Sequence, residues 1–369
     1  MKLVVLTDSP EVWGAEKSLL TLLPYLSGSF DTKVVVSTGS PLRLHVESLG
    51  IQCDEHVFNV TAPRDGQRRR WTGVRALAGS SRLRAQIQDA DVVLIFSAWL
   101  LPEALLATKA ARVPVVLDLH ETFSAGFRRR VLGSFFWLCD KVISPSHSTF
   151  EMNGLRVPRG AAIIPRPVQV PPGTGRDVHR SNTIGVFGQI VPHKNVLELV
   201  QSVAWQQSPH QLAIVGGEPD ASRRSAYENA VRDAAAAGGS SVRVIDRVAD
   251  VFPLMAECTA LINCSRHEAF GRTIAEAAMM GTVPIAVGRT GAAEVTRTIA
   301  FGRSVAEFDE LQDLITTGEL MTITAEERSA GQQRAVATFD AATVAVSYRD
   351  ALQQVTKKRR PKASKKPTA

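Results

Sequence analysis

Short apolar runs alternate with helical patterns along most of this 369-residue sequence, and this alternation constrains the fold more than any other feature. Runs such as Lys2–Thr7 and Asp91–Phe96 are rich in Val, Leu and Ile, which is typical of strands buried on both faces. After the first run, Leu19, Leu22 and Leu26 recur at helical spacing. Strands separated by helices predict parallel β-α-β units. Further strands are predicted at 33–37, 113–118, 141–144, 183–187, 211–215, 242–245, 260–263 and 283–287.

A proline-rich segment divides the pattern into two parts. Residues 165–175 contain four prolines, which cannot lie inside a helix or a central strand. We therefore expect an α/β domain over residues 1–164, a linker over 165–181 and a second α/β domain over 182–335. Ligands of such sheets gather at the carboxyl ends of the strands, so the loops that follow the strands are the ones to examine.

The net charge of +7 belongs to one end of the chain. Residues 357–369 contain seven Lys or Arg and no acid, so residues 1–356 carry no net charge, and a fold specific for nucleic acid is not expected. We expect residues 356–369 to be disordered. Two alternatives remain open for this tail, attraction to anionic lipid and simple solubilisation. Arg128–Arg130 precede an apolar and aromatic run, which suits either a helix on an anionic membrane or a helix packed in the core.

Cysteine usage and hydropathy limit the compartment. The four cysteines are scattered, with no Cys-x-x-Cys pair, which fits a reducing cytosol and suggests no metal site. The longest apolar stretch, residues 92–107, is interrupted by Pro102 and Glu103 and is shorter than the roughly 20 residues that a membrane span needs. We expect a cytoplasmic protein, with contact at the inner face of the membrane as the alternative.

The most informative loop lies between the strands at 260–263 and 283–287. It carries Glu268 and then begins a helix that carries Glu276. The start of a helix offers free N–H groups and the positive end of a dipole, both of which suit a phosphate. Eight helical residues rise by about 12 Å, comparable to the distance from the ribose to the sugar in a nucleotide sugar. Carboxylates accept hydrogen bonds from paired hydroxyls, so the two glutamates could hold such a molecule lengthwise.

With Phe270 and Gly271 between the two glutamates, this loop resembles the Glu-x7-Glu motif of retaining glycosyltransferases of the GT-B fold, particularly glycosyltransferase family 4. The resemblance implies two Rossmann-like αβα domains facing across a cleft, with C-terminal helices at 336–355 returning to the first domain. It also implies a retaining, metal-independent, hexosyltransferase-type enzyme without a cofactor. Such an enzyme moves sugar from a nucleotide-diphosphate sugar to a saccharide or lipid-linked acceptor, in surface polysaccharide or glycolipid synthesis. Glu268 would bind hydroxyls of the donor sugar and Glu276 those of the ribose.

The same resemblance assigns the other donor residues. Residues 188–195 are similar to a Gly-Arg-x-x-x-x-Lys-Gly loop, in which the Arg and Lys neutralise the diphosphate. Lys194 matches this pattern, whereas Gln189 stands where Arg is usual, and Arg272 or Arg266 is the candidate replacement cation. The remaining assignments are the amides around Ala269, Phe270 and Gly271 for the diphosphate, Arg247 and Val248 for the base, and Glu294 for ordering the site.

Two loops of the first domain complete the predicted site. In the first, Gly14 permits close backbone approach to the donor, and Trp13 replaces a glycine that is usual in the family and would shape an acceptor pocket. In the second, His120 ends a strand on the ligand side, and its pKa near neutrality suits proton or phosphate chemistry. The resemblance places His120 and Glu121 on the acceptor side, with His120, Lys194 and Glu268 as the catalytic group.

Two other classes of protein remain open. A nucleotide-sugar epimerase or a sugar phosphorylase uses the same twin α/β domains. A non-catalytic protein of polysaccharide assembly is favoured slightly by Gln189 and Trp13, and disfavoured by the intact Glu268, Glu276 and Lys194.

Overall fold

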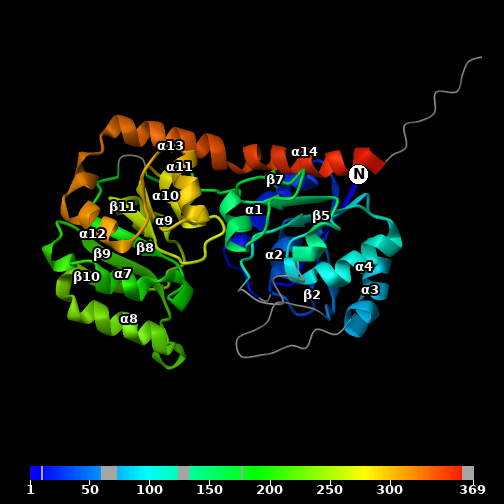
Figure 1. Ribbon diagram of the computed structural model, residues 1–369, viewed down its shortest axis with the longest axis horizontal. Helices are drawn as coiled ribbons and strands as arrows, with labels where there is room; N and C mark the ends of the chain where they lie inside the picture. The colour runs from blue at the N-terminus through cyan, green and yellow to red at the C-terminus, as the bar shows by residue number, and fades with distance from the viewer. Residues whose placement is uncertain (10, 60–72, 124–132, 176–177, 360–369) are drawn as a thin grey trace, which may run out of the picture. The chain divides into compact units, whose positions relative to one another are not determined.

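A computed structural model describes residues 1–9, 11–59, 73–123, 133–175 and 178–359 of the chain. These residues form two units, each built on one parallel sheet with helices on both faces (Figure 1). The first unit consists of Met1–Pro145, Asn153–Pro167 and the chain from Ala341 onward. The second consists of Ser146–Met152 and Val168–Asp340.

The first unit contains a seven-stranded sheet with strand order β3-β2-β1-β4-β5-β6-β7. Strand β1 pairs in parallel with both β2 and β4, so strands β2 and β3 lie on one side of it and β4 to β7 on the other. The strands are β1 (Lys2–Thr7), β2 (Asp31–Ser37), β3 (Gln52–His56), β4 (Val92–Ile95), β5 (Val115–Asp118), β6 (Lys141–Ser144) and β7 (Ala162–Ile163). The helices are α1 (Gly14–Ser27), α2 (Leu42–Ser48), α3 (Gly73–Ile87), η1 (Ala98–Leu100), α4 (Leu101–Ala111) and α14 (Ala341–Arg359).

The helices of the first unit lie on both faces of its sheet. Leu3 and Val5 of β1 share one buried cluster with Leu19 of α1 and with Val344 and Tyr348 of α14. Helices α3 and α4 pack against each other, and both can be followed in Figure 1. The central strands are therefore buried on both sides, which explains their continuous apolar sequences.

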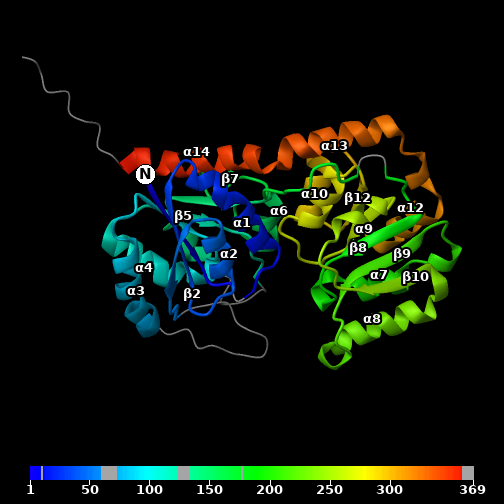
Figure 2. The same ribbon diagram turned by 180° about the vertical axis from the view of Figure 1, so that it is seen from behind.

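The second unit contains a six-stranded sheet with strand order β10-β9-β8-β11-β12-β13. Figures 1 and 2 show this unit from the front and from behind. Its strands are β8 (Thr183–Phe187), β9 (Gln211–Gly217), β10 (Val242–Asp246), β11 (Ala260–Asn263), β12 (Val283–Val287) and β13 (Arg303–Val305). Its α-helices are α6 (His147–Met152), α7 (Val196–Ser202), α8 (Ala226–Ala237), α9 (Phe252–Glu257), α10 (Arg272–Met279), α11 (Gly291–Thr298), α12 (Phe308–Thr316) and α13 (Ala325–Phe339). Short 3-10 turns are η2 (Pro192–Lys194), η3 (Trp205–Gln207), η4 (Ala221–Arg223), η5 (Gly239–Ser241) and η6 (Glu319–Thr322).

Helices α7 and α8 pack together beside one face of this sheet, and α10 packs with both α11 and α13. Helix α13 begins at a capping box, in which the Thr324 hydroxyl accepts from the Glu327 amide and the Glu327 carboxylate accepts from the Thr324 amide. The order of strands changes direction between β8 and β11, so their carboxyl ends flank the position where ligands of such sheets bind.

The structure confirms the two parallel-sheet α/β domains and differs from the sequence analysis in three places. Residues 146–152, assigned from sequence to the first domain, group with the second unit because α6 packs on α11. The helices expected to return to the first domain over residues 336–355 do so only from Ala341, because residues up to Asp340 belong to the second unit. Residues 356–359, expected in a disordered tail, continue α14, where Val355 and Thr356 are buried.

Candidate functional site

Lys194 and Glu268 form an ion pair, although 74 residues separate them in the sequence. Lys194 ends the turn η2 after β8, and Glu268 lies in the loop after β11, the neighbouring strand. The Lys194 Nζ donates to Glu268 Oε2 at 2.7 Å. Neighbouring parallel strands bring the loops at their carboxyl ends together, so the pair sits at the edge where a ligand is expected.

Three further groups fix the Glu268 carboxylate. Asn263 Nδ2 and Ser265 Oγ donate to Oε2, each at 3.3 Å, and the Gly271 amide donates to Oε1 at 3.3 Å. Burial works to raise the pKa of Glu268, but Lys194 and these hydrogen bonds outweigh it and lower the pKa below its ordinary value. Glu268 is therefore ionised, and its carboxylate is fixed in a position where it can accept hydrogen bonds. Asn263 and Ser265 were missed from sequence, where only their closeness to the motif pointed to them.

Glu276 lies one turn into α10, where its Oε1 accepts from Arg272 Nε at 2.7 Å. Its side chain is only 9% exposed. Phe270, just before the helix, is buried and packs edge-on against Phe339 of α13. The loop backbone is thus anchored by a core aromatic ring, while the two predicted carboxylates each have a cation beside them.

Arg266 and Arg272 were the candidates to replace the cation missing at Gln189. Arg266 Nε donates to Asn195 Oδ1 at 2.8 Å, and its guanidinium pairs with Glu198. This side chain therefore connects the loop after β11 to α7. Arg272 stays close to Glu276 at the start of α10. Gln189 itself is exposed just after β8. Within the described residues both guanidinium groups are therefore paired with carboxylates, Arg266 with Glu198 and Arg272 with Glu276.

The loop after β12 packs directly on the Glu268 loop. The Gly291 amide, at the first residue of α11, donates to the Glu268 carbonyl oxygen at 2.8 Å. A Cβ at Gly291 would overlap the carbonyl oxygen of Ala269, and a Cβ at Gly271, where φ is +83°, would lie 2.7 Å from Ala292 Cβ. Both glycines are therefore required by close backbone approach.

We predict that Gly291→Ala lowers the free energy of unfolding by about 1–3 kcal/mol, the usual range for an overpacked interior. The added methyl group has to displace the Ala269 carbonyl, which also accepts two side-chain hydrogen bonds. Urea titration measures this loss. Gly14→Ala is the control, because a Cβ there meets no atom within 4 Å. An unchanged unfolding midpoint for Gly291→Ala would contradict the close approach.

Helix α6 is bound to the same loop. Ser146 Oγ and Thr149 Oγ1 both donate to the Ala269 carbonyl, at 2.6 Å and 3.1 Å. Glu294 of α11 accepts hydrogen bonds from the amides of His147 and Ser148. Glu294 was expected to order the site, and in the structure its carboxylate caps α6.

The predicted base-binding bend lies at the ends of β9 and β10. The Arg247 amide donates to the Gly217 carbonyl at 2.8 Å, and Val248 packs against the core. Arg232 pairs with Glu228 of its own helix and with Asp246 at the end of β10. The bend is therefore fixed, with the side chain of Arg247 exposed.

The acceptor-side residues and Gly14 all belong to the first unit, at the carboxyl edge of its sheet. Trp13 precedes α1, and its amide donates to Glu16 Oε2 at 3.0 Å. Gly14 begins α1 and is exposed. Glu121 Oε1 accepts from the Ala98 amide at 2.8 Å, which ties the loop after β5 to the loop after β4.

His120 sits on a buried charged cluster that sequence reasoning missed. Its Nδ1 lies 3.6 Å from Asp118 Oδ1. Arg166 donates to both oxygens of Asp118, and the Tyr348 hydroxyl donates to Asp118 Oδ2 at 2.7 Å. The Arg166 guanidinium also stacks over Phe96, whose ring contacts His120. In the sequence, this cluster was indicated only by Asp118, an acidic residue at the end of an otherwise apolar strand.

Charges in the cluster set the protonation of both groups. Burial alone would raise the pKa of Asp118, but Arg166 and His120 outweigh it, and the pKa lies well below its usual range. Burial works to lower the pKa of His120, while the carboxylates of Glu121 and Asp118 overcome it and raise the pKa above its ordinary value.

The described residues contain no cluster of His, Cys, Asp or Glu that could hold a metal ion. The sequence has an Asp-x-Asp triplet at Asp89-Ala90-Asp91. Asp89 pairs with Lys2 Nζ, and Asp91 accepts from the Lys2 amide, at the amino end of β1. This is the edge opposite the ligand side, so the triplet is structural.

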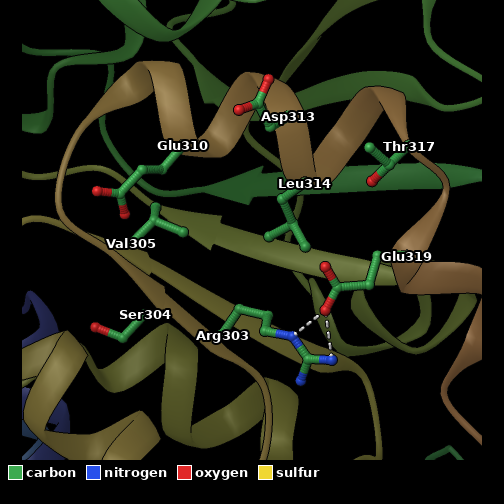
Figure 3. A pocket seen from close by; sticks show the side chains of 8 residues that line it. All are labelled: Arg303, Ser304, Val305, Glu310, Asp313, Leu314, Thr317 and Glu319. Atoms are coloured by element: carbon green, nitrogen blue, oxygen red, sulfur yellow. Dashed lines mark hydrogen bonds and ion pairs between the residues drawn. The ribbon is translucent and has the colours of Figure 1, made fainter.

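A pocket of about 340 Å³ lies away from these residues, between β13 and α12 (Figure 3). Arg303 there pairs with Glu319 at 2.8 Å, and Glu310 and Asp313 add two more carboxylates to its wall. Three carboxylates against one guanidinium disfavour a diphosphate. None of the predicted site residues lines this pocket.

Two predicted contact regions, Arg128–Arg130 and the basic tail from residue 360, lie outside the described residues. Among the residues that are described, no helix is both long and apolar enough to cross a membrane.

Family models match both halves of the chain. The model of Glycosyltransferase Family 4 matches residues 12–170, and the model of Glycosyl transferases group 1 matches residues 181–316. None of the curated proteins matches the sequence.

Solved structures resemble the whole chain. Anabaena HepE, in complex with UDP-glucose, is 22% identical, with a TM-score of 0.76 over 96% of this chain and 100% of HepE. A glycosyltransferase from Rickettsia africae is 17% identical, with a TM-score of 0.76 over 96% of this chain and 98% of that one. Sucrose-phosphate synthase from Thermosynechococcus elongatus is 15% identical, with a TM-score of 0.71 over 97% and 100%. These likenesses show a shared fold.

Proposed function

Since the chain belongs to the group 1 and family 4 glycosyltransferases and has their GT-B fold, we propose that it transfers a sugar from a nucleotide-diphosphate sugar to a saccharide or lipid-linked acceptor with retention of configuration. The observation that carries this proposal is the Lys194–Glu268 pair at the carboxyl edge of the second sheet. In this proposal Glu268 accepts hydrogen bonds from the hydroxyls of the donor sugar, and Lys194 is the cation that binds its phosphates.

The chemistry follows from charge. As the bond between the anomeric carbon and the diphosphate breaks, negative charge grows on the leaving oxygen. Lys194 and the start of α10 face this charge and stabilise it, so no step in the proposal calls for a metal. The acceptor oxygen bonds to the anomeric carbon on the same face, and its proton passes to the departing diphosphate. Glu276 holds the ribose, and His120 and Glu121 orient the acceptor.

Structures of similar fold guide the choice of donor. HepE was crystallised with UDP and with UDP-glucose, so a uridine diphosphate sugar is the first donor to test. Thermal-shift measurements with UDP, GDP and ADP sugars should reveal one nucleotide that stabilises the protein. Ligand at 100 times its dissociation constant adds about 2.7 kcal/mol. If none of these nucleotide sugars stabilises the protein, the proposed function is wrong.

Product analysis separates transfer from the alternatives. Incubation of the stabilising nucleotide sugar without acceptor should give slow hydrolysis, whereas an epimerase would convert the sugar. With a lipid-linked saccharide acceptor, NMR of the product should show the anomeric configuration of the donor. Inversion, or a covalent glycosyl-enzyme detected by mass spectrometry, would contradict the mechanism.

A further inference from the structure

The segment Ser146–Asn153 makes hydrogen bonds at both ends. Its first residues bond to the loop proposed to bind the donor, and its last residue bonds to the loop proposed to bind the acceptor. At its start, the hydroxyls of Ser146 and Thr149 donate to the carbonyl of Ala269, in the donor loop 268–271. At its end, Asn153 Nδ2 donates to the Glu121 carbonyl at 2.9 Å, in the acceptor loop 119–123. Its Oδ1 accepts from the Phe123 amide at 2.7 Å. One short piece of chain therefore bonds to both loops.

Glu294 fixes the start of this segment to α11. Its Oε1 accepts from the His147 amide at 2.9 Å, and its Oε2 accepts from the Ser148 amide and hydroxyl at 3.0 Å. These bonds satisfy N–H groups that the first turn of α6 leaves without helical partners. A carboxylate also interacts favourably with the positive end of the helix dipole.

The segment between the two attachment points is stiff. Thr149, Phe150 and Asn153 are fully buried, and Ser146 is 1% exposed. Residues 147–152 are one continuous helix, with no glycine or proline that would allow bending. The chain passes from the first unit to the second at Ser146 and returns at Asn153.

We propose that Ser146–Asn153 couples the donor loop to the acceptor loop, with Glu294 and Asn153 as positioning residues at its two ends. The naming of the loops rests on the proposed function, whereas the coupling rests on the contacts alone. A nucleotide that orders the donor loop fixes the Ala269 carbonyl, and α6 then holds Asn153 and the backbone on either side of Phe123. Coupling of this kind is reciprocal, so an ordered acceptor loop strengthens nucleotide binding.

The first test needs no ligand. In Glu294→Gln and in the double variant Ser146→Ala/Thr149→Val, hydrogen exchange of the Phe123 amide should become at least about tenfold faster, because its acceptor Asn153 is released. Exchange in strand β11 should stay at the wild-type rate, which separates this effect from global unfolding. Glu151→Gln, on the exposed side of α6, is the matched control and should leave Phe123 unchanged. Wild-type exchange at Phe123 in both test variants would overturn the coupling.

The second test uses UDP as the probe. Saturating UDP should slow exchange at Phe123 in the wild type, although Phe123 belongs to the other unit. In Glu294→Gln, UDP should still raise the melting temperature but no longer slow exchange at Phe123. Binding of UDP to the wild type without any change at Phe123 would refute the coupling. If UDP does not bind, the donor assignment is at fault, and the ligand-free comparison still decides whether the loops are connected.

Discussion

Replacing Lys194 by alanine is expected to lower kcat by about 100- to 1,000-fold, the loss found when one charge-stabilising donor is removed from an active site. The ammonium group has three protons, of which one is donated to Glu268 at 2.7 Å. Two remain for oxygens of the leaving diphosphate. Steady-state kinetics with the donor identified by thermal shift measures the effect.

The same substitution should change the pH profile. Lys194 lowers the pKa of Glu268 against the opposing effect of burial. Without the lysine, burial raises this pKa, and the carboxylate begins to take up a proton at higher pH. A protonated Glu268 loses part of its capacity to accept hydrogen bonds from sugar hydroxyls. The acidic limb of the kcat/KM profile should therefore move to higher pH in Lys194→Ala.

Two variants control for a general loss of positive charge. Lys194→Arg keeps the cation and should recover part of the activity. Arg266→Ala should change kcat less than about tenfold, because that guanidinium is engaged with Asn195 and Glu198. Turnover of Lys194→Ala within twofold of the wild type would show that Lys194 does not stabilise the leaving group.

The sequence identified the central strands of both sheets but missed three edge strands, β3, β7 and β13. Central strands such as β4 and β11 are buried on both faces and read as continuous apolar runs. The edge strand β3 reads Gln-Cys-Asp-Glu-His, and β13 reads Arg-Ser-Val. An edge strand is only partly covered, so its sequence need not be apolar. The pattern that reveals a strand is absent where burial is absent.

The candidate site divides in a similar way. Lys194 and Glu268 were predictable as neighbours because each follows a strand and because parallel strands present their carboxyl ends at one edge. Asp118, Arg166 and Tyr348 could not be grouped, because Asp118 is 48 residues from Arg166 and 230 from Tyr348. Their contact depends on α14 lying against the first sheet, which no local pattern specifies.

The largest expected effect on stability comes from Arg166→Met. Asp118 is completely buried, and Arg166 supplies the positive charge that compensates it. Removing one partner of a buried pair leaves an unpaired charge and costs about 3–5 kcal/mol. Urea unfolding at neutral pH should show this loss. The double variant Asp118→Asn/Arg166→Met removes both charges and should recover most of it, since the Tyr348 hydroxyl can still donate to the asparagine oxygen.

The stability deficit of Arg166→Met should change with pH if it comes from the unpaired Asp118 carboxylate, and should not change if it comes from lost packing. In the wild type the pKa of Asp118 is lower in the folded state, so its contribution is present above about pH 4 and is lost as the pH falls through the folded pKa. In Arg166→Met, burial raises the pKa, so the carboxyl is most stable when protonated and the contribution is lost as the pH rises. The deficit of Arg166→Met relative to the wild type should therefore shrink between pH 7 and pH 4. A deficit that is the same at both values would mean that lost packing around Arg166, and not the unpaired carboxylate, destabilises the variant.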